Sequence, residues 1–117
     1  MLQRKLLDGS GRRLSEEAVQ EIVRRIVGVC HPERVILFGS AATEEMTPDS
    51  DIDLLVIERG VEDVRRETLL IRSALVDLPS PFYVIVMTSD RFEETRNVIG
   101  GIAWPAARYG KVIHEAA

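Results

Sequence analysis

A short stretch of the chain combines residues that bind phosphate with residues that bind cations. Gly39-Ser40 ends one apolar run, and Asp51-Ile52-Asp53 opens the next, with ten residues between the serine and the first aspartate. Glycine at the end of a buried strand lets a ligand approach the backbone, and a serine hydroxyl beside free amide groups binds phosphate. Two carboxylates supply the oxygen ligands that divalent cations prefer. Together these residues predict a site for a nucleoside triphosphate with Mg²⁺.

The two aspartates need a physical reason to stand so close together. Side chains alternate between the faces of a strand, so Asp51 and Asp53 share one face and the aliphatic residues among them take the other. Two carboxylates about 4 Å apart repel by roughly 4 kcal/mol where the effective dielectric constant is near 20. A cation between them, protonation of one, or splaying into solvent would relieve this repulsion. Turn residues 48–50 favour splaying, whereas Gly39-Ser40 favours a cation.

Two common nucleotide-binding motifs are absent from the sequence. No G-x-x-x-x-G-K-[ST] loop occurs, and no G-x-G-x-x-G opens a helix. These absences exclude a P-loop protein and a dinucleotide-binding Rossmann protein.

Apolar periodicity predicts the elements that must position these residues. Ser15 is the expected N-cap of a first helix, with Glu16 and Glu17 in its first turn and an end near residues 28–32. The further predicted elements are strand 35–38, a brief helix 41–46, strand 51–57, helix 61–78, strand 82–87, a helix from 88 toward 98, a short helix ended by Gly110, and edge strand 111–114.

This order of elements predicts an α/β (α+β) fold, a small sheet with helices packed against it, because strands this apolar must be covered. A length of 117 residues predicts a single domain, 1–117, with 1–13 as a loose lead-in. The chain is 45% hydrophobic and 29% charged, which is typical of a soluble globular protein.

Charge and cysteine content narrow the function classes. A formal net charge of −4 disfavours a protein that coats nucleic acid. The pairs Arg12-Arg13, Arg24-Arg25 and Arg65-Arg66 are more typical of solvated helix faces and ends than of a basic patch. One cysteine, Cys30, and no apolar run long enough to span a membrane make the cytoplasm the expected location.

The strand, Gly39-Ser40, the ten-residue spacer and Asp51-Ile52-Asp53 resemble the G-S-x10-D-x-D signature of the DNA polymerase β-like nucleotidyltransferases. Chain length and element order resemble the minimal nucleotidyltransferase (MNT) subgroup from about residue 15 onward. The resemblance implies the nucleotidyltransferase fold. It also implies that Gly39 and Ser40 bind the nucleotide phosphates and that Asp51 and Asp53 are catalytic metal ligands.

The same resemblance implies a function. MNT proteins are frequently antitoxins paired with a HEPN-domain toxin, which they adenylylate on a tyrosine with ATP and Mg²⁺. We therefore expect transfer of AMP to a hydroxyl of a HEPN-domain partner, an acceptor that suits the acidic chain better than nucleic acid does, in a homo- or hetero-oligomer.

The sequence departs from the family at two positions. The third carboxylate expected on the next strand is replaced by Tyr83, and the segment Ala41-Ala42-Thr43 lacks the arginine often found after the serine. The first departure leaves open an alternative, a catalytically impaired nucleotide-binding module that neutralises its partner by contact. A third possibility is an α/β domain whose acid pair is only part of a turn.

The sequence gives weaker support for a functional role of the other residues considered. Cys30, His31 and His114 lack the ligand spacing of a zinc site. Trp104 and Tyr109 are expected to pack in a core or an interface, with stacking on a base as the alternative. Arg65, Arg66 and Arg72 would meet phosphate only if their helix faced the nucleotide.

Overall fold

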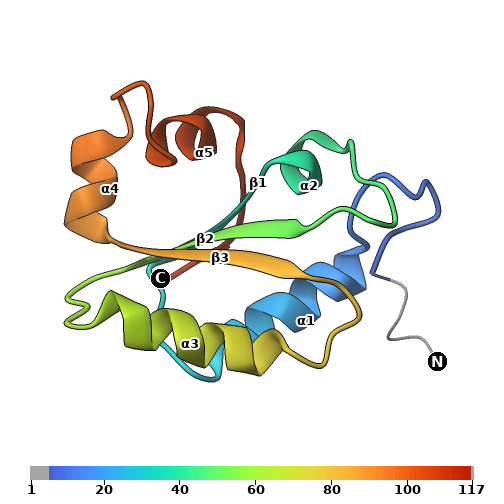
Figure 1. Ribbon diagram of the computed structural model, residues 1–117, viewed down its shortest axis with the longest axis horizontal. Helices are drawn as coiled ribbons and strands as arrows, with labels where there is room; N and C mark the ends of the chain where they lie inside the picture. The colour runs from blue at the N-terminus through green and yellow to red at the C-terminus, as the bar shows by residue number, and fades with distance from the viewer. Residues whose placement is uncertain (1–5, 117) are drawn as a thin grey trace.

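The computed structural model describes residues 6–116, which form a four-stranded sheet with helices on both faces (Figure 1). The elements are α1 (Glu16–Val27), β1 (Arg34–Phe38), α2 (Ser40–Thr43), β2 (Ile52–Glu58), α3 (Val64–Leu75), β3 (Phe82–Thr88), α4 (Ser89–Thr95), α5 (Ala103–Tyr109) and β4 (Lys111–Glu115). The predicted fold class and order of elements are confirmed.

The sheet has the strand order β3-β2-β1-β4 and is mixed. Strand β1 runs antiparallel to both β2 and β4, whereas β2 and β3 are parallel. In this register Asp53 of β2 lies opposite Phe38 of β1 on one side and Tyr83 of β3 on the other. Residues directly opposite each other project to the same face of a sheet, so these three side chains form one row.

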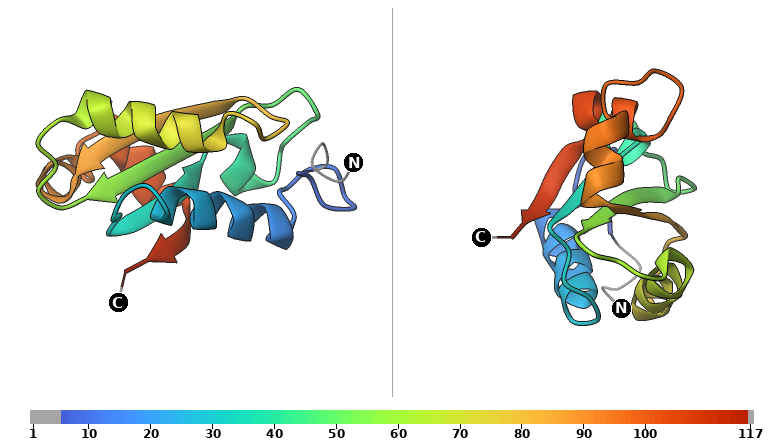
Figure 2. Two further views of the ribbon diagram at one scale, coloured as in Figure 1. Left: turned by 90° about the horizontal axis from the view of Figure 1, so that it is seen from below. Right: turned by 90° about the vertical axis from the view of Figure 1, so that its left-hand side faces the viewer.

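Two helical layers cover the sheet, with α1 and α3 on one face and α4 and α5 on the other (Figures 1 and 2). Ile52, Leu54 and Val56 of β2 pack in the core beneath α1 and α3. Leu55 and Ile57 belong to the smaller core beneath α4 and α5. The alternation therefore places Asp53 on the α4–α5 face.

Local chemistry explains where α1 begins. The Ser15 hydroxyl oxygen accepts a hydrogen bond of 3.0 Å from the Ala18 amide, which satisfies one of the free donors at the helix start. Glu16 and Glu17 lie in the first turn, where the helix dipole favours negative charge. The predicted N-cap is therefore confirmed.

Two predicted helices are shorter than expected. The brief helix ends at Thr43 rather than Met46, because Glu44 adopts a left-handed backbone with φ of 61°. Helix α3 occupies 64–75 within the predicted span 61–78, and Asp63 caps it by accepting a hydrogen bond from the Arg66 amide. Within α3, Ile71 and Leu75 are buried, but Leu69 is 57% exposed.

Part of the lead-in has more structure than the sequence predicted. Leu7 and Leu14 form an isolated antiparallel bridge, and the turn between them is closed by a hydrogen bond from the Asp8 amide to the Arg13 carbonyl. The Met46 amide donates to the Arg12 carbonyl, which ties this turn to the segment after α2. Residues 1–5 of the predicted lead-in lie outside the described residues.

Across residues 6–116, none of the helices is both long enough and apolar enough to cross a membrane.

Candidate active site

Gly39 brings the backbone at the end of β1 into direct contact with Asp53. The glycine has φ of 67° and ψ of −148°, a conformation that other residues adopt only with strain. A Cβ atom at this position would lie 2.3 Å from Oδ2 of Asp53. Only glycine leaves room for the carboxylate, so Gly39 and Asp53 form one packed unit.

Ser40 follows at once as the first residue of α2. This single helical turn is closed by hydrogen bonds from the Ala42 and Thr43 amides to the Gly39 carbonyl. The first amide groups of a helical turn have no partner inside it, so they are available to an anion. The Gly39-Ser40 turn and the Asp53 carboxylate therefore adjoin the same point at the end of β1.

Asp51 and Asp53 differ in their surroundings. Asp53 is half-buried within β2, and Asp51 is exposed immediately before the strand. Burial raises the pKa of Asp53, and the negative charge of Asp51 raises it further. The two acids therefore interact electrostatically, and the fold carries an unfavourable charge that a bound cation would offset.

Tyr83 occupies the place opposite Asp53 on the neighbouring strand. Its side chain is 53% exposed, so it is not the sheet-filling aromatic that a strand tyrosine usually is. The nearest acid after it in sequence, Asp90, follows Thr88 at the opposite end of the seven-residue strand. The register therefore places a phenol beside Asp53 where the family resemblance predicts a third carboxylate.

The acid pair suits a divalent cation that arrives with a nucleotide. Mg²⁺ is commonly held by one or two protein carboxylates, with phosphate oxygens and water completing its shell. Within residues 6–116, no three His, Cys, Asp or Glu side chains are grouped so that they could hold a metal ion. Asp51 and Asp53 would thus supply the protein part of the Mg²⁺ coordination shell, and the triphosphate would contribute further oxygen ligands.

Thr43 is the polar residue of the segment Ala41-Ala42-Thr43, and its side chain contacts protein groups. Its hydroxyl lies 2.7 Å from Oε1 of Glu45 and 3.3 Å from the Gly39 carbonyl oxygen. It stabilises the end of the α2 turn and brings no positive charge to the site.

Two of the three arginine pairs contain arginines that form ion pairs with acidic neighbours. Arg13 pairs with Asp8 and Glu44, and Arg25 pairs with Glu21 and Asp77. Arg65, Arg66 and Arg72 belong to α3, on the face of the sheet opposite Asp53 (Figure 1). The α3 arginines therefore do not meet a phosphate bound at Gly39-Ser40.

Trp104 and Tyr109, the aromatic residues considered for packing or base stacking, contact each other. The rings of Trp104 and Tyr109 meet edge to face with centroids 6.1 Å apart, and the Arg108 guanidinium lies 4.8 Å from the centroid of Trp104. Packing within α5 accounts for these contacts, as the sequence predicted.

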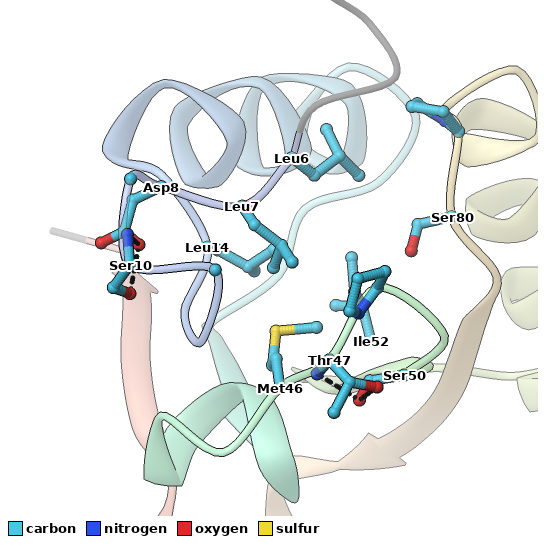
Figure 3. A pocket seen from close by; sticks show the side chains of 14 residues that line it. Leu6, Leu7, Asp8, Ser10, Leu14, Met46, Thr47, Ser50, Ile52 and Ser80 are labelled. Carbon is cyan, nitrogen blue, oxygen red and sulfur yellow. Dashed lines mark hydrogen bonds between the residues drawn. The ribbon is translucent and has the colours of Figure 1, made fainter.

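Figure 3 shows a cavity near the start of β2. The N-terminal turn and the loop after α2 line it, with Leu7, Leu14 and Met46 among its apolar walls. Ile52 also lines it, and Ile52 points away from the face of Asp53. The Ile52 wall of this cavity therefore lies on the face of the sheet opposite Asp53, although Ser50 and Ile52 flank Asp51 in the chain.

One buried acid was not singled out from the sequence. Glu58, the last residue of β2, is only 5% exposed, and its Oε2 has no hydrogen-bond partner among the described residues. Burial raises its pKa, and the charge of Glu67 adds to this. Its place at the end of the apolar run, next to Arg59-Gly60, gave no sign of burial.

A mixed sheet with a Gly-Ser turn against an acid pair is the architecture of the nucleotidyltransferase class. The sequence profile of the nucleotidyltransferase domain family matches residues 16–101, and the chain belongs to this family. Domains of this family generally use a nucleoside triphosphate and a divalent metal. None of the curated proteins compared with the chain matches it significantly.

A solved structure supports the fold. The crystal structure of a candidate nucleotidyltransferase from Sulfolobus solfataricus matches with a TM-score of 0.53 and 18% sequence identity. The match covers 80% of this chain and 75% of that chain. At this level of identity the likeness establishes the fold, and the chemistry must be argued from the site.

Proposed function

We propose that this protein transfers AMP from ATP, with Mg²⁺, to a hydroxyl group of a HEPN-domain partner in the cytoplasm, as the antitoxin of a toxin–antitoxin pair. The contact between Gly39 and Asp53 is the observation that carries the proposal, because the Gly39-Ser40 turn and the acid pair adjoin each other there. Membership of the nucleotidyltransferase domain family supports the general reaction.

Each group in the site has a distinct task in this reaction. The amides of the Gly39-Ser40 turn and the Ser40 hydroxyl hold the β- and γ-phosphates. Asp51 and Asp53 hold the cation, which when bound neutralises negative charge on the triphosphate. The acceptor oxygen attacks the α-phosphorus, and pyrophosphate leaves.

Two properties favour a protein acceptor. The net charge of −4 opposes association with a nucleic acid backbone. Gly39, Asp51 and Tyr83 are all exposed, so a large partner can reach the α-phosphate without entering a deep cleft.

Tyr83 supports a second candidate function. The position opposite Asp53 bears a phenol, so the acceptor hydroxyl lacks a carboxylate there to take its proton. A module that binds MgATP and neutralises its partner by contact alone is the alternative.

Transfer to the partner distinguishes the two candidates. The protein is incubated with labelled ATP, Mg²⁺ and a candidate HEPN-domain partner. We expect label on the partner, and we expect Asp51→Asn and Asp53→Asn each to reduce the rate at least 100-fold, on the scale of losing electrostatic stabilisation of the transition state. Asp49→Asn, at an exposed acid before the strand, is the matched control and should retain the rate.

Two results would count against the proposal. Full inhibition of the partner without any label would favour the contact-only module. Label transfer at the wild-type rate by both aspartate variants would show that the acid pair does not serve the reaction.

A further inference from the structure

Tyr83 is an exposed nucleophile beside the acid pair. In the parallel register of β2 and β3 it lies directly opposite Asp53, and β3 is an edge strand. Adjacent strands are about 4.8 Å apart, so the two backbones are immediate neighbours. Tyr83 is 53% exposed, so its side chain is accessible to solvent.

The faces of β3 confirm the direction of this side chain. Val84 and Val86 are buried in the core beneath α1 and α3, whereas Ile85 and Met87 pack against the core beneath α4 and α5. By alternation Tyr83 belongs with Ile85 and Met87, on the face that carries Asp53. It stands at the end of that face where the Gly39-Ser40 turn lies.

The length of the side chain matters for what Tyr83 does there. A carboxylate at this position would end close to the sheet and act on an acceptor beyond it. A phenol extends one aromatic ring further from the strand, so its hydroxyl reaches beyond the point where a carboxylate would end.

We propose that Tyr83 is itself a nucleotide acceptor, so that the chain adenylylates its own Tyr83 from ATP. This inference rests on the proposed function, because it uses the same nucleotide site. It adds a modification site on this chain that would cover the acid pair once the adduct forms.

The step balances without any further reactant. The Tyr83 Oη atom forms a bond to the α-phosphorus, and the bond from that phosphorus to the oxygen bridging the β-phosphate breaks. Pyrophosphate leaves with the electron pair of that bond, and the phenolic proton passes to water. The product is a phosphodiester between the tyrosine and the nucleoside.

The chain offers a matched control for this proposal. It has two tyrosines, and Tyr109 is 62% exposed, at least as accessible as Tyr83. Tyr109 belongs to α5, and its ring contacts Trp104. A reaction guided by the site should modify Tyr83 alone, whereas non-specific chemistry would follow exposure.

The test uses the purified chain alone with ATP and Mg²⁺, followed by intact-mass measurement and peptide mapping. We expect one added nucleotide per chain, located on Tyr83. Tyr83→Phe and Asp53→Asn should each abolish it, and Tyr109→Phe should retain it. Titration calorimetry should show that Tyr83→Phe still binds MgATP, which separates loss of the acceptor from loss of the site.

A mixture of variants tests whether the reaction occurs within one chain. Asp53→Asn supplies an intact Tyr83 without a working site, and Tyr83→Phe supplies the site without the acceptor. We expect this mixture to remain unmodified. Modification of the Asp53→Asn chain would show that the nucleotide is transferred between chains. It would overturn the proposal that Tyr83 reacts at the site of its own chain.

Three other outcomes would also overturn the proposed self-modification of Tyr83. Label on Tyr109, or on several residues, would overturn the proposal. An unmodified chain that nevertheless labels its HEPN-domain partner would overturn self-modification and leave the proposed function standing. Absence of both label and MgATP binding would overturn the two together.

Discussion

At the scale of single residues, Gly39 is required by both backbone conformation and space. Its φ is 67°, and a Cβ atom would lie 2.3 Å from Oδ2 of Asp53. Gly60 also has a positive φ, 68°, but a Cβ atom there would meet nothing within 4 Å. The two glycines therefore separate the cost of backbone strain from the effect of displacing the site carboxylate.

This contrast gives a prediction. Gly60→Ala should destabilise the protein by about 1–2 kcal/mol through strain alone, as positive φ values generally do. Gly39→Ala should cost more and should abolish MgATP binding, because Asp53 must move away from the turn. Chemical denaturation measures the first effect and titration calorimetry the second. Equal destabilisation with binding retained in both variants would show that the Gly39–Asp53 contact is unimportant.

At the scale of elements, the apolar residues of α3 are not all buried, so residue type alone does not predict burial in this helix. The helix carries aliphatic side chains on its inner and outer faces alike. Ile71 is 0% exposed, whereas Leu69, two residues earlier, is 57% exposed. Only the inner residues contact the sheet and α1, so only these contribute much to stability.

The expected consequence is a large difference between two similar substitutions. Ile71→Ala should lower the free energy of unfolding by about 2–5 kcal/mol, the usual cost of a cavity in a core. Leu69→Ala should change it by only about 0.5 kcal/mol, as is common at exposed positions. Urea denaturation of both variants measures this. Similar losses in the two would indicate that α3 is rotated from the orientation described above.

At the scale of the whole molecule, the layer of α1 and α3 closes over a buried acid. Glu58 ends β2, Glu67 belongs to α3, and Cys30 follows α1. Burial, and then the charges of Glu58 and Glu67, raise the pKa of the Cys30 thiol to about 12. The helical layer therefore holds an acid whose charged form burial and Glu67 disfavour, with only partial compensation from the His31 backbone and the Cys30 thiol.

A dependence of stability on pH follows. The folded-state pKa of Glu58 lies above its unfolded value near 4.5, so the folded state binds the proton more tightly. Its favourable contribution is complete below pH 4.5 and is lost as the pH rises toward the folded-state pKa. Glu58→Gln cannot ionise, so it carries no charge for Glu67 to repel. We expect this variant to exceed the wild type by about 1 kcal/mol or more at neutral pH.

Thermal or chemical unfolding from pH 4 to pH 8 checks this prediction. The advantage of Glu58→Gln should shrink as the pH falls. Glu62→Gln, at an exposed glutamate, is the control and should follow the wild type throughout. A Glu58→Gln variant that is less stable at neutral pH would show that the carboxylate has favourable partners.

Local information was enough to predict most elements. The Ser15 cap, the apolar period of α1 and the run before Gly39 are encoded by neighbouring residues, so they could be recognised one segment at a time. The ends of α2 and α3 were less accurate, because a left-handed Glu44 and the Asp63 cap depend on choices that periodicity does not reveal.

By itself the sequence determined the class of fold and the residues of the candidate site, because caps, alternation and the spacing of Gly39-Ser40 from Asp51-Ile52-Asp53 are properties of the chain. Only the tertiary structure decided how these residues meet. The parallel pairing of β2 and β3 places Tyr83 opposite Asp53, and the packing of α3 on the other face removes its arginines from the site. These are long-range choices, made by which strands pair and which faces are buried, and no local pattern in the chain specifies them.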